Sequence, residues 1–205
     1  MLGLPRSTEV NSRVAKEKLY ANTALTAQLR DMVKSQIESV IWRNKLAEST
    51  MGISKGESVN EIQIFEIMLR QRGLDRRILP AIVKAIPYKI LFVLTFNGEI
   101  QAWMEASSTF FNTEWLPLDA FTVKIEGLNL DAVYENLVRQ IANGRLGSGG
   151  DIAEAVDRDK QRQGLKRGIA ALEKKLLREK QFNRQVELSG ELKRLRKELE
   201  VGING

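Results

Sequence analysis

Glutamates are the residues of this chain whose type and spacing come closest to a catalytic centre. Metal-dependent nucleases often place an acidic residue on one strand and Glu-x-Lys on the next, so that carboxylates hold the metal and the lysine steers a water or a phosphate. Here Glu61-x-Gln63 follows a strand-like segment that carries Lys45. Glutamine in the lysine position weakens the pattern, and no aspartate is well placed upstream. The glutamates considered as metal ligands are Glu48, Glu57, Glu61 and Glu66.

Two missing residue types narrow the chemistry further. The 205 residues include no His and no Cys, which removes the usual general base near neutral pH, thiolate chemistry, disulfides and the commonest transition-metal ligands. Catalysis would have to use carboxylates, lysines, hydroxyls or an oxygen-bound metal such as magnesium. Because a glutamate at the end of a strand is far more often solvated or salt-bridged, the sequence predicts no catalytic residue, no bound metal and no cofactor.

Two cations in the first half of the chain are candidates for binding phosphate. Arg43 and Lys45 stand two residues apart in an alternating segment, so we expect them on one face of a strand, with the hydroxyl of Thr50 shortly after. Arginine and lysine side chains bind the phosphates of nucleic acids in this way. The alternative is an exposed strand face on which the cations only interact with water.

Three aromatic side chains could stack on bases or on a partner peptide. They are Trp103, Phe111 and Trp115. Stacking on exposed aromatic rings is the usual way in which proteins hold unpaired bases. Packing within the core or over the sheet is the more common role of such residues, and we expect it here.

The strongest binding signal lies in residues 160–200. This segment contains 13 Lys or Arg against 6 Glu, a net charge of +7, whereas the rest of the chain has 19 basic and 20 acidic residues. Its cations cluster at helical spacing as Lys174, Lys175 and Arg178, and as Arg194 and Lys197. Such a helix binds a nucleic-acid backbone electrostatically without reading its sequence. A solvated face, with glutamates pairing along the helix, is the alternative.

Leucines in the same segment form two helical seams. The first consists of Leu165, Ile169, Leu172 and Leu176, and the second of Leu188, Leu192, Leu195 and Leu199. The second seam lies about 120° around the helix from the first, so one straight helix cannot bury both against one surface. We therefore expect a helical hairpin or a bent arm, or a coiled coil with a partner. Because the second seam is farther from the rest of the chain and beside a basic cluster, we predict that it binds a second protein.

The elements that must position these residues indicate an α+β protein. A mixed, mainly antiparallel sheet of about five strands with flanking helices is expected in residues 1–143, followed by a Gly-rich linker (144–150) and a basic helical arm (151–205). Expected helices cover residues 16–36, either continuous or broken near Asn22, 75–85 and 130–142. Expected strands cover residues 37–46, 60–69, 88–96, 99–107 and 121–126. Asn97-Gly98 predicts a two-residue hairpin turn and Asn129 a helix cap.

The chain has no segment suited to a bilayer or to export. Residues 1–10 lack the apolar core of a signal peptide, and the longest apolar run, residues 86–96, is short and contains Lys89. We therefore expect a cytoplasmic protein that does not contact membranes.

Five stretches resemble a family of bacterial proteins of unknown function. They are LPRSTEVN near the start, IWRNKL with Thr50 after it, NEIQIFEI, KAIPYKILFVL, and EKQFNRQVELSGELKRL in the tail. Members of that family are commonly encoded beside helicase and DNA methyltransferase genes in restriction-like or phage-defence loci. The resemblance covers most of the chain in the same order, and it implies genomic neighbours but no active site.

These observations together favour a non-enzymatic accessory subunit of a restriction-like or phage-defence complex. We expect it to dock on a helicase or methyltransferase, or to form a homodimer, and to contact DNA through its basic arm. A divergent metal-dependent nuclease and a purely structural adaptor that does not bind nucleic acid are the alternatives.

Overall fold

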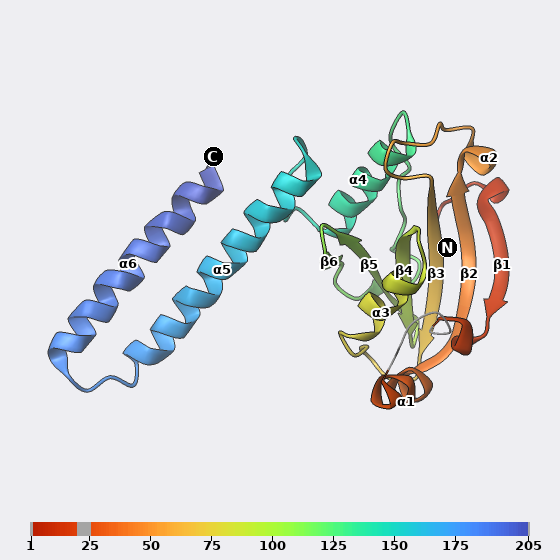
Figure 1. Ribbon diagram of the computed structural model, residues 1–205. Helices are drawn as coiled ribbons and strands as arrows, with labels where there is room; N and C mark the ends of the chain where they lie inside the picture. The colour runs from red at the N-terminus through yellow and green to blue at the C-terminus, as the bar shows by residue number, and fades with distance from the viewer. Residues whose placement is uncertain (1, 20–25, 205) are drawn as a thin grey trace. The chain divides into compact units, whose positions relative to one another are not determined.

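The computed structural model of the protein describes residues 2–19 and 26–204 (Figure 1). The chain divides into two compact units, Met1–Arg145 and Leu146–Gly205. The first is called the body below and the second the hairpin. The division between the two falls within residues 144–150, the segment expected to be a linker.

A seven-stranded sheet forms the centre of the body. Its strands follow the order β1-β2-β3-β4-β5-β6, and the short β7 pairs with β5. Neighbours are antiparallel except β3 and β4, which are parallel. The strands are β1 (Glu9–Val14), β2 (Ile37–Ala47), β3 (Glu61–Leu69), β4 (Lys89–Phe96), β5 (Glu99–Ala106), β6 (Thr109–Asn112) and β7 (Leu116–Pro117). The expected mixed, mainly antiparallel sheet is confirmed, and it is larger than the five strands expected.

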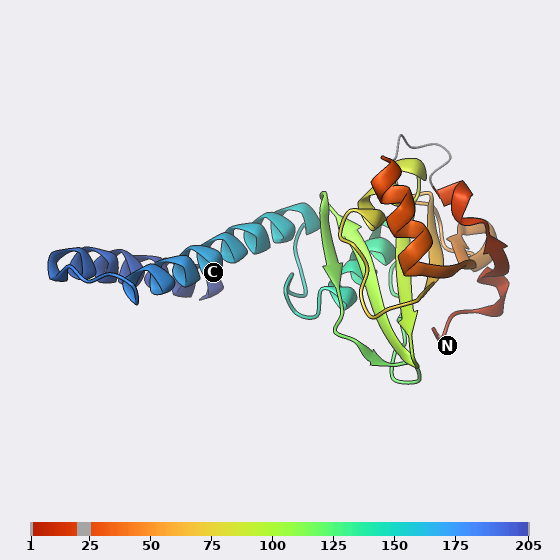
Figure 2. The ribbon, with the colours of Figure 1, turned by 90° about the horizontal axis from the view of Figure 1, so that it is seen from below.

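Helices cover both faces of this sheet (Figure 2). The helices of the body are η1 (Arg6–Thr8), η2 (Lys16–Leu19), α1 (Ala27–Gln36), α2 (Glu48–Met51), α3 (Ile78–Ala85) and α4 (Leu130–Ile141). On one face Val33 of α1 and Ile78 of α3 belong to the same core as Phe65 and Phe92 of β3 and β4. The opposite face is covered by α4, which buries a stripe of apolar side chains against the sheet. The helix α3 makes the crossover that two parallel strands require.

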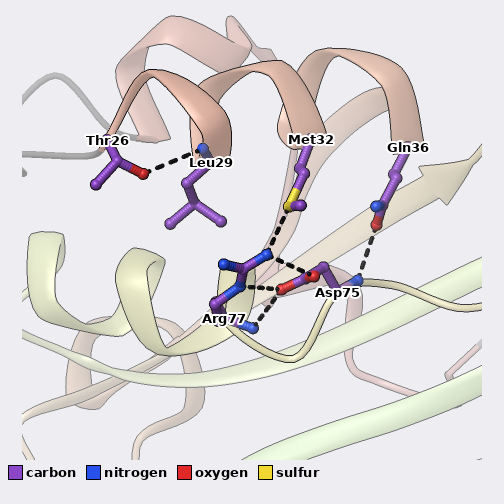
Figure 3. Close-up of polar contacts among 6 residues, drawn as sticks. All are labelled: Thr26, Leu29, Met32, Gln36, Asp75 and Arg77. Carbon is purple, nitrogen blue, oxygen red and sulfur yellow. Dashed lines mark hydrogen bonds and ion pairs between the residues drawn. The ribbon is translucent and has the colours of Figure 1, made fainter.

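Polar contacts hold α1 against the loop that precedes α3 (Figure 3). The backbone N–H of Asp75 donates to Gln36 Oε1 at 2.8 Å. Arg77 donates to both carboxylate oxygens of Asp75, from Nε at 2.9 Å and from Nη2 at 3.1 Å, and Nη2 also lies 3.0 Å from Met32 Sδ. These hydrogen bonds keep the pKa of Asp75 low, at about 2.

Two turn and cap predictions are confirmed. Asn97 and Gly98 have φ angles of 47° and 78° and connect β4 to β5, as a tight hairpin between twisted strands requires. Asn129 caps α4, because its Oδ1 accepts the N–H of Ala132 at 2.9 Å. Both features depend only on residues next to each other in the chain, which is why the sequence alone identified them.

The strand expected at residues 121–126 does not form. These residues are extended and join no strand of the sheet. Instead, the side-chain amide of Gln140 on α4 bonds both backbone groups of Lys124, accepting its N–H at 2.9 Å and donating to its carbonyl at 2.8 Å. The Val123 N–H donates to the carbonyl of Leu2. A side chain and the N-terminal segment thus satisfy backbone groups that a neighbouring strand would otherwise pair.

The N-terminal region also differs from expectation. The helix expected over residues 16–36 is divided into η2 and α1, and residues 20–25 between them lie outside the described residues. Residues 9–14, where no strand was expected, form the edge strand β1. The residues of β1 are mostly polar and exposed, so they lack the alternating apolar pattern that reveals a half-buried strand.

The hairpin consists of α5 (Ile152–Leu176) and α6 (Phe182–Asn204), which lie side by side in both views (Figures 1 and 2). Gly168 of α5 faces Leu195 of α6, and Arg196 pairs with Glu173 at 2.7 Å. The helices are therefore antiparallel, and of the forms expected for the arm the hairpin is the one observed. In residues 2–19 and 26–204, no helix has both the length and the apolar character needed to cross a bilayer.

Candidate functional site

The cations of the hairpin that were expected to contact nucleic acid are all exposed. They are Lys174 and Lys175 on α5, Arg178 in the turn after it, and Arg194 and Lys197 on α6. Among residues 2–19 and 26–204, none of the five forms an ion pair. Glu173 and Glu179, which are close to them in sequence, pair with Arg196 and Arg184 instead. The five positive charges are therefore available to a partner outside the chain.

The two clusters take different positions on the hairpin. Lys174 lies about 170° around α5 from its apolar seam and Lys175 about 90° from it, whereas Arg178 lies just beyond the end of α5. Arg194 and Lys197 lie about 170–230° around α6 from its own seam. Because the two seams face one another, Lys174 and the pair Arg194 and Lys197 occupy opposite outer surfaces.

The seams themselves meet inside the hairpin. Leu188 and Leu192 are only 6% and 7% exposed, and Leu195 and Leu199 are half-buried. The break between α5 and α6 turns the second seam toward the first, so the difference in phase that a straight helix could not accommodate disappears. Partner binding by Leu188, Leu192, Leu195 and Leu199 stays a prediction, and it would require the hairpin to open.

The end of the hairpin exposes apolar side chains that the sequence pattern did not single out. Leu177 is 87% exposed, Phe182 74% and Val186 56%. Between them, Glu179 accepts the backbone N–H groups of Gln181 and Lys180, and these bonds together with nearby cations lower the pKa of its carboxyl. These three apolar residues are called the hairpin tip below. None of the three belongs to either seam, so leucine periodicity did not reveal them.

The expectation that Arg43 and Lys45 share one face is wrong, because a β-bulge separates them. The register between β2 and β3 shifts between Trp42 and Asn44. Residues two apart share a face only in a regular strand, and the extra residue of a bulge reverses that relation. The side chains of Arg43 and Lys45 consequently take different partners on β3, and Arg43 and Lys45 do not form one phosphate site.

The glutamates considered for metal binding are dispersed. Arg43 Nε donates to Glu66 Oε2 at 2.5 Å, and Lys45 Nζ pairs with Glu61 at 2.7 Å. Glu61 and Glu66 are an odd number of residues apart on a regular strand, so they lie on opposite faces of the sheet. Glu48 and Glu57 are exposed on α2 and on the loop after it. Across the described ranges, no three acidic side chains come close enough to hold a metal ion.

The Thr50 hydroxyl is used within the chain. Its Oγ1 donates to the Lys45 carbonyl at 2.8 Å and accepts the Ala47 N–H at 3.0 Å. These bonds close the turn between β2 and α2, where the chain leaves the sheet. Thr50 is therefore a turn residue, and its hydroxyl is not directed to a ligand.

The three aromatic residues have different environments. Phe111 is fully buried, with the Arg145 guanidinium 4.8 Å from its ring centre. Trp115 is half-buried beneath Arg72, and the Trp103 indole N–H donates to Gln101 Oε1 at 2.8 Å. Trp103 also lines a depression of about 290 Å³ on the α3 face. Phe111 packs in the core, the two tryptophans cover the sheet, and Trp103 borders a cavity.

A polar cavity in the body contains residues that sequence reasoning missed. It measures about 400 Å³ and is lined by Leu2, Gly3, Leu4, Arg6, Glu9, Asn11, Arg43, Asn44, Glu66 and Val93. Arg6, Glu9 and Asn11 come from the stretch LPRSTEVN, Arg43 and Asn44 from IWRNKL, and Glu66 from NEIQIFEI. Val93 comes from KAIPYKILFVL, so four of the stretches on which the family resemblance rests meet here. The presence of these residues in stretches that resemble the family was the signal that could have identified them in the sequence. Only the fold brings the stretches together.

Comparison with known proteins gives one match. A family model described as "Domain of unknown function (DUF4391)" matches residues 2–199, nearly the whole chain. Searches of curated proteins and of solved structures found no significant match.

Proposed function

The chain belongs to the family described as Domain of unknown function (DUF4391), and from that premise we propose that it is an accessory subunit without catalytic activity that contacts the backbone of DNA through the exposed cations of its hairpin.

One observation carries this proposal. The hairpin turns its leucines inward and leaves five cations exposed, none of which forms an ion pair with a carboxylate in the described part of the chain. Lysine and arginine on an outer helix surface bind phosphates by charge and release of counterions. Neither cluster includes the amide or aromatic side chains that read base edges or stack on bases. The expected binding is therefore strong at low salt, weak at high salt and independent of sequence.

The protein partner in this proposal is a helicase or DNA methyltransferase of a restriction-like or phage-defence locus. Members of the family that the chain resembles are commonly encoded beside helicase and DNA methyltransferase genes, which supports that choice. The hairpin tip supports a protein contact, since exposed apolar side chains beside cations suit an apolar surface with an acidic rim. In this arrangement the tip contacts protein while the outer helix surfaces contact DNA. A homodimer through the same tip is the other arrangement we consider.

Salt-dependent binding to a short duplex tests the DNA contact. We expect Kd to rise steeply between about 50 and 200 mM salt, and the variant Lys174→Gln/Lys175→Gln/Arg178→Gln to lower the slope of log Kd against log salt by up to about 3, near 0.9 for each lost phosphate contact. Fluorescence anisotropy with two unrelated duplex sequences measures both affinity and the absence of sequence preference.

A matched control variant distinguishes a local contact between the hairpin cations and DNA from a general effect of the protein's net charge. Arg30→Gln/Lys34→Gln/Lys84→Gln removes the same charge from exposed positions of α1 and α3, and we expect it to leave the slope unchanged. If both triple variants weaken binding equally, the hairpin is not the DNA contact. If the unaltered protein does not bind duplex at low salt, the chain is a structural adaptor.

A further inference from the structure

The cavity beside Glu66 has the features of a ligand site, and it is independent of the hairpin. Its volume of about 400 Å³ falls within the range of small-molecule sites. Its walls combine apolar side chains, Leu2, Leu4 and Val93, with two guanidinium groups, two carboxylates and two amides. Four segments distant in sequence supply these groups, so the cavity exists only in the folded body.

Two backbone irregularities border the cavity. The register between β1 and β2 shifts between Glu9 and Ser12, and Asn11 has a φ of +48°. The second shift, in β2, brings Arg43 and Asn44 to the same cavity. A left-handed residue other than glycine and a β-bulge each cost conformational energy or ladder pairing, and both are concentrated near functional sites. Here they direct Asn11 and Arg43 toward each other, since Arg43 Nη1 lies 3.3 Å from Asn11 Oδ1.

Glu66 forms the inner end of the cavity. Its side chain is 5% exposed, and Oε2 accepts the Nε–H of Arg43. Within residues 2–19 and 26–204, no protein group donates a hydrogen bond to its other carboxylate oxygen, and that oxygen is not among the fully buried unpaired atoms, so it is open to the cavity. A carboxylate oxygen at a cavity wall accepts strong, charge-assisted hydrogen bonds. The inner end therefore suits an N–H or O–H group of a ligand.

Arg6 forms the solvent end. It is exposed, and no side-chain hydrogen bond or ion pair engages its guanidinium in the described part of the body. Glu9, the other charged residue at this end, accepts a bond from Asn11 Nδ2 at 3.1 Å. A free guanidinium group at the entrance of a cavity binds phosphate with paired hydrogen bonds.

We propose that this cavity binds a nucleoside monophosphate, with a base N–H or ribose O–H donating to Glu66 and the phosphate bound by Arg6. The apolar residues Leu2, Leu4 and Val93 contact the flat base. The same chemistry is present in a free nucleotide and in the phosphorylated terminal nucleotide of a DNA strand. The proposal does not depend on DNA binding by the hairpin.

A titration of the full chain with candidate ligands, in which binding is measured from the NMR chemical shifts of the backbone amides, tests the site. The probes are the four common nucleoside 5′-monophosphates, the same nucleosides without phosphate, inorganic phosphate, and a 5′-phosphorylated oligonucleotide. We expect at least one monophosphate to bind with Kd between about 10 μM and 1 mM, with shifts concentrated in residues 2–11, 43–44 and 66. The nucleoside and inorganic phosphate should each bind at least about tenfold more weakly. Tighter binding of the oligonucleotide than of its terminal nucleotide identifies a strand end as the source.

Two variants with different effects keep the proposal falsifiable. Arg6→Gln alters an exposed side chain and should weaken the monophosphate about tenfold while leaving the nucleoside unchanged, whereas Glu66→Gln should weaken both. Arg30→Gln, an exposed arginine on α1, is the matched control and should change neither. If Glu66→Gln unfolds the protein, Arg6→Gln decides. Absence of shifts up to about 10 mM of every probe, or equal binding by unaltered protein and Arg6→Gln, overturns the proposal.

Discussion

At the scale of single residues, polar side chains of the body act mainly as partners for one another. Arg43 is bound to Glu66, Lys45 to Glu61, and Arg77 to Asp75. A charged residue singled out in sequence as a phosphate ligand or metal ligand can therefore be neutralised by a residue twenty positions away. The exposed cations of the hairpin differ because none of the five forms an ion pair within the described residues.

The Asp75–Arg77 contact makes a prediction about pH. Hydrogen bonds from Arg77 lower the pKa of Asp75 from 3.8 to about 2. Because the folded-state value lies below the unfolded one, this carboxylate stabilises the fold above pH 3.8, and the contribution is lost as pH falls through about 2. Asp75→Asn should therefore lower the urea midpoint near neutral pH, with the difference from the unaltered protein disappearing near pH 2.

A second aspartate serves as the control for this measurement. Asp31 on α1 is exposed, and its carboxylate takes part in no hydrogen bond or ion pair within the described ranges. Asp31→Asn should follow the unaltered protein across the pH range. A constant difference between Asp75→Asn and the unaltered protein down to pH 2 would show that Asp75 acts through something other than its charge.

At the scale of elements, the position of a helix break decides which surfaces are exposed. The end of α5 at Leu176 and the start of α6 at Phe182 allow the two seams to pack together. The same break leaves the hairpin tip exposed, since side chains in and beside a turn have no helix opposite them. A Cβ at Gly168 would lie 3.5 Å from Leu195, an ordinary contact distance, so the packing of the two helices does not require glycine there.

Alanine substitutions distinguish the contribution of the second leucine seam to stability from that of the hairpin tip. Leu192→Ala removes a buried side chain and should destabilise the hairpin by about 2 kcal/mol, whereas Leu177→Ala, at an exposed position, should change stability by less than about 0.5 kcal/mol. Hydrogen exchange of the α5 and α6 amides measures both. If Leu192→Ala leaves exchange protection intact but disrupts an assembly, the second seam binds a partner as the sequence predicted.

At the scale of the whole molecule, positive charge and candidate chemistry occupy different units. Residues 160–200 carry the net charge of +7, and the polar cavity beside Glu66 belongs to the body. A protein that contacts DNA with one unit and a small ligand with the other needs no catalytic group of its own. Such a division suits an accessory subunit, as proposed.

The absence of nuclease activity is the corresponding prediction. We expect purified protein with magnesium or manganese to leave plasmid DNA uncut over a range of pH, because Glu61 is paired with Lys45 and lies on the opposite face of the sheet from Glu66. Gel analysis of supercoiled plasmid measures this. Cleavage that Glu61→Gln abolishes in a folded protein would establish the nuclease alternative, while cleavage that persists in that variant would indicate a contaminant.

Local features were readable in the amino-acid sequence by itself. Alternation predicted β2, a run of branched and aromatic residues predicted β3, Asn97-Gly98 predicted the turn between β4 and β5, and Asn129 predicted the start of α4. Each depends on backbone preferences and apolar periodicity within a few residues. Only the tertiary structure decided the bulge at Arg43, the pairing of Gln140 with Lys124, the meeting of the two leucine seams and the cavity beside Glu66. The physical reason is that ion pairs, cavities and faces depend on which distant segments pack together, and no local preference specifies that.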